Sequence, residues 1–219
     1  MKIAIIGSGF FGLTLGLFLS KTNEVHIFEK EKKILNGASA ANQFRFHLGY
    51  HYPRSQKTVT EINKSKKLFT KYYGETIFQK TLNYYSIAVE SKVNFNQYKK
   101  FLKKNKLYNK IVKNFLPNKM INETILTNEK ILNYFSFKKI ISKKVKNSKL
   151  KIKLNKQFKK SFLKNYDKII VTAYSNNNKI LENLGVKKLD DFKFELVEKI
   201  VIKLPQKYVN KSFVVIDGK

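Results

Sequence analysis

The sequence contains no cysteine and no tryptophan, and only three prolines and nine glycines in 219 residues. The absence of cysteine excludes a disulfide scaffold, a thiolate metal site and a cysteine nucleophile. Acidic residues are also scarce, with 15 Asp and Glu against 45 Lys and Arg, so the formal net charge is +30. Apolar residues still make up 42% of the chain, which is enough to build a hydrophobic core and argues against a disordered protein.

The positive charge is almost entirely lysine, because Arg45 and Arg54 are the only arginines. Lys, Asn, Ile, Phe and Tyr, which share A/T-rich codons, account for 116 of the 219 residues. The charge therefore has two interpretations: a surface that binds nucleic acid or an anionic membrane, or a composition set by codon bias. A phosphate-binding surface usually recruits arginine as well, since its planar fork matches phosphate. This favours codon bias and predicts no specific nucleic-acid partner.

Residues 1–21 include an apolar run that a secretory signal peptide would also contain. Against that alternative, only Lys2 precedes the run, glycines interrupt it, and no small-residue cleavage site follows before Lys21. The stretch 10–19 is shorter than the ~20 residues that a helix needs to cross a bilayer. We expect a soluble, cytoplasmic chain without a transmembrane segment.

The first thirty residues predict a βαβ unit that binds a dinucleotide. The apolar run Lys2–Ile6 is typical of a strand buried on both faces of a parallel sheet. It leads into a G-x-G-x-x-G motif at residues 7–12, then a helical pattern and a second apolar strand, Val25–Phe28. Glu29 ends this strand, 22 residues after Gly7 and close to the expected ~20.

Each part of the motif has a physical role. Gly7 permits a tight turn, Gly9 lets the backbone approach a pyrophosphate, and Gly12 lets the helix pack closely on the strand. The helix N-terminus offers N–H groups to phosphates, and the carboxylate of Glu29 can accept hydrogen bonds from ribose hydroxyls. The alternative is a βαβ unit whose glycines serve only packing. The predicted cofactor-binding residues of this part are Gly7, Ser8, Gly9, Phe10, Phe11, Gly12, Glu29 and Lys30.

An acid after the second strand disfavours the 2′-phosphate of NADP, so the cofactor is FAD or NAD. Residues 37–55, GASAANQFRFHLGYHYPRS, do not continue the alternating strands and helices of a nicotinamide enzyme. With the motif before it, this segment resembles the FAD-dependent oxidoreductases of the D-amino-acid oxidase superfamily, which includes glycine and sarcosine oxidases and glycerol-3-phosphate dehydrogenases. The resemblance implies FAD as cofactor and hydride transfer from a carbon that bears an amine or a hydroxyl. It also implies that Ser39 and Asn42 lie along FAD, and that Arg45 lies near the flavin or a substrate carboxylate.

The window 42–54 is a candidate site on composition alone. Both arginines, together with His47 and His51, fall within it. In a chain that otherwise uses lysine, a retained arginine suggests a geometric requirement. The histidines either hydrogen-bond within a partly buried loop or face the substrate or flavin. We therefore predict Arg45, His47 and His51 as catalytic candidates, and no metal site, because no third ligand accompanies the two histidines.

The remaining patterns predict further elements of an α/β protein. Helices are expected at 55–73, within 95–115 as one or two surface helices, from 128–131 onward and at 179–184; strands are expected at 82–89, 149–154, 167–174, 192–204 and 213–216. The lysines and aromatic residues of 95–115 offer the best support for nucleic-acid binding, although a solvated lysine face over an aromatic core explains them more simply. The resemblance assigns Val145 to a backbone contact with adenine and Ala173 to a second FAD-binding segment. Tyr174 stands where that segment usually has glycine.

The predicted architecture is a Rossmann-like FAD/NAD(P)-binding domain with a parallel sheet, interleaved with a partial α+β substrate domain. Residues 1–78 and 129–185 are assigned to the FAD-binding domain, and residues 79–128 and 186–219 to the substrate domain. The family's closing flavin-binding segment has no counterpart, so we expect a fragment of a longer flavoprotein, or a chain completed by a partner. The leading function is an FAD-dependent oxidoreductase acting on a small amine or hydroxy compound. The alternatives are a non-catalytic or partner-completed FAD-binding protein and a basic nucleic-acid-binding protein.

Overall fold

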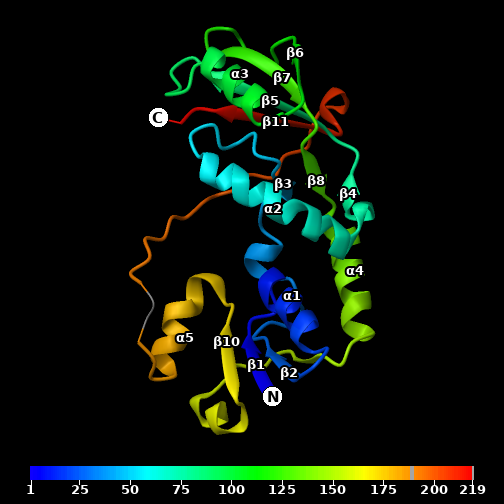
Figure 1. Cartoon of the computed structure of the whole chain (residues 1–219), viewed down its shortest axis with the longest axis vertical. Helices are drawn as coiled ribbons and strands as arrows, with labels where there is room; N and C mark the ends of the chain where they lie inside the picture. Colours follow the sequence, from blue (N-terminus) through cyan, green and yellow to red (C-terminus); the bar gives the residue numbers. More distant parts are fainter. Residues whose placement is uncertain (188–189, 219) are drawn as a thin grey trace. The chain divides into compact units, whose positions relative to one another are not determined.

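A computed structural model shows a four-stranded parallel sheet. It consists of β1 (Lys2–Ile6), β2 (Glu24–Phe28), β9 (Lys151–Lys153) and β10 (Lys168–Val171), in the order β10-β1-β2-β9. Figure 1 labels β1, β2 and β10 of this sheet. The central strand β1 pairs with β10 on one side and with β2 on the other. Its residues 3–5 are at most 2% exposed, as expected where both faces of a parallel sheet are covered. The predicted α/β class and the parallel sheet are confirmed.

The structure describes residues 1–187 and 190–218, which divide into two compact units. Unit 1 contains residues 1–43 and 138–200, and unit 2 contains residues 44–137 and 201–219. These bounds differ from the predicted domains, because residues 44–78 and 129–137 lie in unit 2 rather than with the parallel sheet, and residues 186–200 lie in unit 1 rather than in unit 2. A division into compact units does not test which residues contact a cofactor, so the functional domains stay a prediction.

The helices of unit 1 lie between and after its strands. Helix α1 (Phe10–Leu19) follows β1 and buries Leu13 and Leu17. The other elements are α5 (Asn177–Asn183), the 3₁₀ turns η1 (Gly37–Ser39), η3 (Lys160–Asn165) and η4 (Tyr174–Asn176), and the C-terminal part of α4 (Tyr134–Lys146), which begins in unit 2. The order strand–helix–strand at the start of the chain agrees with the predicted βαβ unit.

Unit 2 contains two small sheets. The larger one has the order β11-β5-β7-β6 and the smaller one the order β3-β8-β4. Their strands are β3 (Arg45–Phe46), β4 (Phe78–Gln79), β5 (Leu82–Ala88), β6 (Asn109–Val112), β7 (Ile121–Thr127), β8 (Lys130–Leu132) and β11 (Lys211–Ile216). Only the pair β11–β5 is parallel, and the other pairs are antiparallel. The helices are α2 (Gln56–Tyr73) and α3 (Phe95–Lys104), with 3₁₀ turns η2 (Glu75–Ile77) and η5 (Gln206–Tyr208).

The core of unit 2 is rich in tyrosine. Tyr50, Tyr85 and Tyr98 are fully buried among aliphatic residues of β5, β7, β11 and α3. Burial raises the pKa of Tyr50 to about 12 and the pKa values of Tyr85 and Tyr98 well above their ordinary value. Their phenol groups therefore stay neutral, and each hydroxyl donates a hydrogen bond, as buried polar groups require.

Most of the predicted elements are present within a few residues of the expected bounds, but three expectations are wrong. Beyond residue 104 the predicted helix gives way to β6, because Lys106 adopts a φ of 53° and residues 109–112 pair with β7. The helix expected from 128–131 begins only at Tyr134, because β8 pairs with both β3 and β4. The described residues of 192–204 form no strand, and Leu196 is fully exposed.

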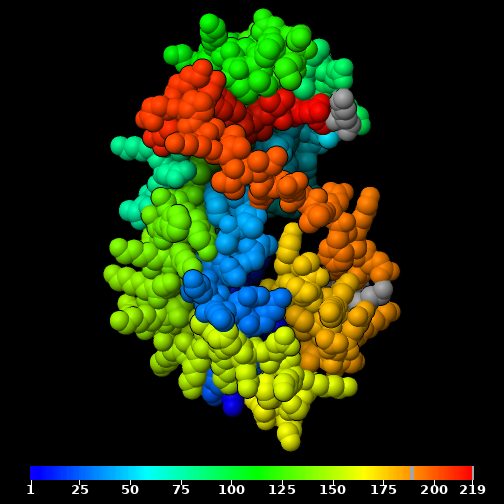
Figure 2. Space-filling model, turned by 180° about the vertical axis from the view of Figure 1, so that it is seen from behind, coloured from blue at the N-terminus to red at the C-terminus, as the bar shows by residue number. Residues whose placement is uncertain are grey.

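The segment 151–168 of unit 1 is rich in exposed lysine. Figure 2 shows the segment 151–168, yellow-green to yellow, on the visible face of this unit. Its exposed lysines are Lys151, Lys153, Lys156, Lys159, Lys160, Lys164 and Lys168. Within the described part of the chain, no helix combines the length and the apolar character needed to cross a membrane.

Candidate functional site

The glycine loop of unit 1 has the tight geometry that the motif predicts. Gly7 has a φ of 104°, a backbone conformation that residues other than glycine rarely adopt. Its N–H donates to the carbonyl of Phe28 at 2.9 Å, which joins the loop to the end of β2. A Cβ on Gly7 would lie 2.8 Å from the carbonyl oxygen of Thr172, and a Cβ on Gly12 would lie 1.9 Å from that of Gly7. Gly7 and Gly12 are therefore required by close backbone packing.

The Glu29 carboxylate is fixed beside this loop. Its Oε2 accepts hydrogen bonds from both the backbone N–H and the hydroxyl of Ser8, each at 2.8 Å. Its Oε1 accepts from the N–H of Glu31 at 2.9 Å. Each carboxylate oxygen has two lone pairs, so Oε2 is fully used and Oε1 can accept one further hydrogen bond from a hydroxyl group of a ligand. The position of Glu29 at the end of β2 is the one predicted for the acid that contacts a ribose.

Ser39 contacts the N-terminus of α1. Its hydroxyl accepts the N–H of Phe10 at 3.0 Å, and a Cβ on Gly9 would lie 3.2 Å from the same oxygen. Asn42 holds the turn that carries Ser39, since its amide donates to the carbonyls of Ala38 at 3.1 Å and Ser39 at 3.3 Å. The structure thus brings Ser39 next to the glycine loop, and Asn42 supports it from an exposed position.

Phe10, Phe11 and Lys30 directly follow the residues of the glycine loop and Glu29 in the chain, and each is at least partly exposed. Phe11 is 74% exposed, and its ring packs against that of Phe10 in a T-shaped arrangement at 5.3 Å. Lys30 is exposed and lies 3.8 Å from the carboxylate of Glu31, an ion pair that solvent screens. Cofactor contact stays a prediction for each of these three residues.

Of the two residues that the family resemblance assigns to FAD, Ala173 lies next to the glycine loop and Val145 lies in a helix. Val145 lies in the last turn of α4, where its carbonyl accepts from the N–H and hydroxyl of Ser148. Ala173 follows β10 next to Gly7, and its N–H donates to the Asn177 side chain at 2.7 Å. Tyr174 adopts a φ of 56°, so it takes the left-handed conformation that glycine usually provides in such a segment.

The segment 153–156 lies beside Glu29, and no sequence pattern identifies it as part of the site. The carbonyl of Lys153 accepts the N–H of Glu29 at 3.0 Å, and the N–H of Lys156 donates to the carbonyl of Glu29 at 2.8 Å. The ammonium group of Lys153 lies 4.9 Å from the centre of the Phe28 ring. The alternating pattern of 149–154 predicts a strand, but it does not reveal that this strand pairs with β2.

The residues of unit 1 fit a dinucleotide on three observations. Two glycines are required by backbone contacts, the N-terminal N–H groups of α1 adjoin the loop, and an acid with unused acceptor capacity ends β2. The first turn of α1 carries no acidic residue that would repel a phosphate. This arrangement can hold a pyrophosphate at the loop and a ribose at Glu29.

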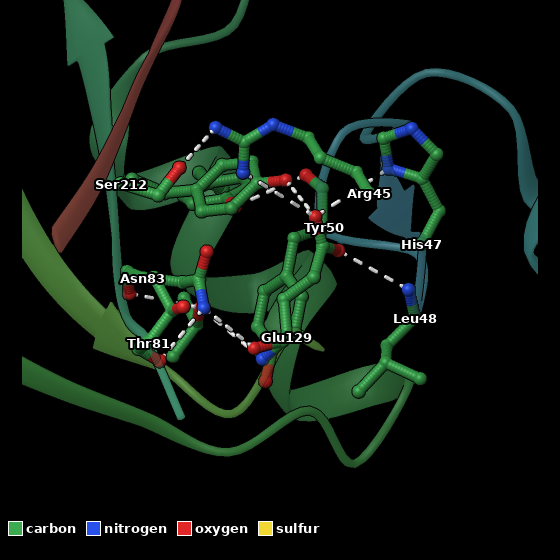
Figure 3. Close-up of polar contacts among 11 residues, drawn as sticks. Arg45, His47, Leu48, Tyr50, Thr81, Asn83, Glu129 and Ser212 are labelled. Carbon is green, nitrogen blue, oxygen red and sulfur yellow. Dashed lines mark hydrogen bonds and ion pairs between the residues drawn. The ribbon is translucent and has the colours of Figure 1, made fainter. Parts of the chain in front are cut away.

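In unit 2 the predicted catalytic candidates lie around a buried carboxylate, that of Glu129. Glu129 is 2% exposed and lies between β7 and β8. Its Oε2 accepts the N–H of Leu48 at 3.1 Å (Figure 3). Its Oε1 accepts the hydroxyl of Tyr85. Its backbone carbonyl accepts the side-chain amide of Asn83 at 2.7 Å. The carboxylate is therefore held from both of its oxygens and from its backbone.

Arg45 lies against this carboxylate. Its Nη1 is 3.9 Å from Oε1 of Glu129, its Nη2 donates to the hydroxyl of Ser212 in β11, and its guanidinium lies over the Tyr85 ring at 5.9 Å. The side chain is 10% exposed, and Nη1 is a buried donor without a hydrogen bond among the described residues. An arginine fork reaches both partners at once, which a lysine ammonium cannot do.

His47 and His51 lie together next to the same group. Nδ1 of His47 is 3.5 Å from Oε1 of Glu129, and the two imidazole rings are 5.7 Å apart. Burial, followed by the charge of His47, lowers the pKa of His51. Arg45, His47 and His51 are thus brought together in unit 2, while their role in catalysis stays a prediction.

Glu129 is the residue of this cluster that the sequence did not identify as functional. The pattern around it indicates a helix start, for which Asn128 and Glu129 are suitable residues. One signal was available: acids number only 15 in the chain, and this one lies between apolar stretches. An acid next to buried strands needs a partner, and the scarce arginines are the natural candidates.

No protein-family model matches the chain. The FAD-dependent monooxygenase FPY4 of Fusarium mangiferae is 31% identical over 100 residues, which cover 45% of this chain and 27% of that protein. Among solved structures, glycine oxidase from Geobacillus kaustophilus matches with a TM-score of 0.65 at 11% identity, over 84% of this chain and 58% of that one. L-proline dehydrogenase from P. horikoshii matches with a TM-score of 0.62 at 16% identity, over 85% and 56%.

An L-α-glycerophosphate oxidase from Mycoplasma pneumoniae with FAD bound matches with a TM-score of 0.54 at 16% identity, over 70% of this chain and 44% of that one. The chain thus spans about a quarter of the curated relative and about half of these structures. The chain has the fold of glycine oxidase and L-proline dehydrogenase over 84–85% of its length, which confirms its resemblance to the D-amino-acid oxidase superfamily at the level of the fold.

Proposed function

We propose that this chain is the dinucleotide-binding part of an FAD-dependent oxidoreductase that oxidises a small amine or hydroxy compound. The observation that carries the proposal is the Glu29 carboxylate, which is fixed at the end of β2 by two hydrogen bonds from Ser8 of the glycine loop. This arrangement suits a cofactor with a pyrophosphate and an unphosphorylated ribose. The similarity to an FAD-dependent monooxygenase and to an oxidase with FAD bound favours FAD over NAD.

Within this proposal, each residue of the loop has a task. Gly7, Gly9 and Gly12 bring the backbone and the start of α1 to the pyrophosphate, and Oε1 of Glu29 accepts a ribose hydroxyl. Ser39 and Asn42 lie along the next part of the cofactor. Bound FAD supplies the two-electron acceptor, while the protein supplies binding, orientation and electrostatics.

The same proposal includes a cytoplasmic location, a small-molecule substrate and no specific nucleic-acid partner. The scarcity of arginine supports the absence of a specific nucleic-acid partner. Of the two arginines, Arg45 contacts Glu129 and Ser212 and is not available to bind phosphate. The second candidate is a non-catalytic or partner-completed FAD-binding protein. It shares the glycine loop and the Glu29 carboxylate with the first candidate and differs from it only in catalysis.

An FAD titration tests the proposal directly. The chain is freed of bound flavin and titrated with FAD, while flavin fluorescence reports binding and NAD serves as a competing ligand. In Glu29→Gln the shape of the side chain is kept and its charge is lost, so the Kd for FAD is expected to rise about tenfold. The matched control is Glu31→Gln, which removes the charge of a half-exposed acid two residues away and is expected to leave the Kd unchanged.

Two results would overturn this function. One is a wild-type chain that stays folded by circular dichroism and binds no FAD. The other is an equal effect of Glu29→Gln and Glu31→Gln, which would mean that the carboxylate at the end of β2 does not contact the cofactor. Flavin reduction by glycine, L-proline or L-α-glycerophosphate then separates the two candidates, because only the catalytic one reduces bound FAD.

A further inference from the structure

We propose that Glu129 and His47 form an acid–base pair in unit 2. In this pair the buried carboxylate orients the imidazole, so that Nδ1 of His47 carries the proton and Nε2 is left as a proton acceptor. The role of Nε2 toward a substrate rests on the proposed function, whereas the pair itself does not. Glu129 is then a positioning residue, and His47 is the group that exchanges the proton.

The burial of Glu129 is the first step of the argument. The side chain is completely inaccessible to solvent, and a buried carboxylate is costly unless its oxygens are paired. Oε2 is satisfied by the N–H of Leu48, and Oε1 by the hydroxyl of Tyr85. One donor comes from β5 and the other from the loop after β3, so the carboxylate cannot turn away from His47.

The orientation of His47 is the second step. Its Nδ1 is buried and lies 3.5 Å from Oε1 of Glu129, with no hydrogen bond to any described residue. Figure 3 shows this nitrogen directed at the carboxylate and the other ring nitrogen directed away from the cluster. A separation of 3.5 Å is longer than a hydrogen bond, but catalytic contacts are often long before a ligand binds.

The chemistry of the ring completes the argument. A neutral imidazole has one N–H and one lone pair, and a hydrogen-bond acceptor next to one nitrogen places the proton there. Since Nδ1 faces a carboxylate, the lone pair falls on Nε2. The His47 side chain is 32% exposed, so the part of the ring away from its buried Nδ1 can be reached by a ligand.

Other charged and titratable groups surround Glu129 and His47 and determine the net charge of the cluster. Arg45 lies 3.9 Å from the same Oε1 and supplies a positive charge, while Tyr85 donates a hydrogen bond from β5. His51 and Tyr52 pack against the His47 ring with centroid distances of 5.7 and 5.6 Å. The positive charge of Arg45 offsets the negative charge of Glu129, which makes the carboxylate tolerable in the core.

The task of the pair in an oxidation follows from proton balance. When a carbon bearing a hydroxyl or amine loses a hydride, two electrons leave with the hydride to the oxidant, here an oxidised flavin. A C=O or C=N bond forms, and the O–H or N–H bond that breaks releases one proton. Nε2 of His47 accepts that proton, and the resulting imidazolium is stabilised by Glu129.

Nitrogen-15 NMR of the histidine rings tests the pair without cofactor or substrate. The chain has only three histidines, so His47→Gln assigns the signal. At alkaline pH, where the rings are neutral, His47 is expected in the Nδ1–H form, and Glu129→Gln is expected to shift it toward the Nε2–H form. The matched control is Glu24→Gln, whose carboxylate lies 3.1 Å from His26 and should leave the His47 signal unchanged.

Acylation by diethyl pyrocarbonate provides a second readout, because the reagent reacts with an unprotonated imidazole nitrogen. The rate at His47, followed by mass spectrometry, is expected to fall several-fold in Glu129→Gln and to stay unchanged in Glu24→Gln. A wild-type His47 in the Nε2–H form would overturn the proposal even if Glu129→Gln fails to fold. Failure to bind FAD would affect neither readout, so the pair and the proposed function fail separately.

Discussion

Gly12 and Gly7 lie so close together that a methyl group on Gly12 would fall 1.9 Å from the carbonyl oxygen of Gly7. The same methyl group would lie 2.7 Å from the hydroxyl of Thr172. The start of α1 is therefore pressed against the end of β1 and the loop after β10. This contact positions the helix N-terminus at the edge of the sheet where a phosphate would bind.

Gly12→Ala is expected to lower the free energy of unfolding by about 2–3 kcal/mol, because two backbone segments must separate to admit the Cβ. Urea denaturation measures the change. The matched control is Gly37→Ala, since Gly37 has a φ of 59° but open space around its Cα. Strain without a clash is expected to cost about 1 kcal/mol there. Equal costs for the two variants would contradict the close packing of α1.

The sequence predicts the βαβ unit because several signals agree there. An unbroken apolar run, a glycine motif and a terminal acid follow one another at the right spacing, and each is needed for the same packing. By contrast, β7 was not predicted, since Asn122, Glu123 and Thr124 interrupt its apolar pattern. Thr124 is nevertheless buried, because its hydroxyl bonds to Ser86 across the sheet.

The residues around Glu129 show why the contacts of the cluster in unit 2 could not be predicted from the sequence. Local preference favours a helix start at Asn128 and Glu129, but two long-range strand pairings of β8 override it. The side chain of Glu129 then points to partners that are 44 and 81 residues away in the sequence, Tyr85 and Leu48. Neither periodicity nor spacing carries information about such contacts, whereas the clustering of arginine and histidine at 42–54 did indicate the region.

Tyr85→Phe is expected to destabilise the chain more than Tyr98→Phe does. Tyr85 donates to the buried Glu129 carboxylate, so its loss should cost about 2–3 kcal/mol, as expected for hydrogen bonds to charged groups. Tyr98 donates to the backbone carbonyl of Tyr50 at 3.0 Å, and its loss should cost about 1 kcal/mol. Both phenols are fully buried, so chemical denaturation compares them directly. A larger cost for Tyr98→Phe would mean that Tyr85 does not support the carboxylate.

Stability is expected to decrease as the pH falls below about 6.5, because two histidines resist protonation in the folded chain. Burial, and then the charge of Lys153, lowers the pKa of His26, and burial lowers that of His51. The unfolded chain then binds more protons than the folded one between the lowered values and the ordinary value of 6.5.

The measurement is the free energy of unfolding at a series of pH values for the wild type and for His26→Gln/His51→Gln. In the double variant the free energy of unfolding should change much less between about pH 6.5 and 5.5 than in the wild type, because carboxylates contribute little in this range. An unchanged pH dependence would show that other groups cause it. His26 also bonds to Tyr166 at 2.8 Å, so the variant is expected to be less stable above pH 7 as well.

Ser39→Ala separates a structural role of the serine from a role at the cofactor. Removing the hydroxyl deprives the N–H of Phe10 of its acceptor at the start of α1, which is expected to cost about 1 kcal/mol. Ser161→Ala, at an exposed serine of η3, is the control and should change stability by less than about 0.5 kcal/mol. If Ser39 also contacts the cofactor, the Kd for FAD rises in Ser39→Ala at a temperature where the variant is fully folded. A stability loss with an unchanged Kd would restrict Ser39 to holding the helix terminus.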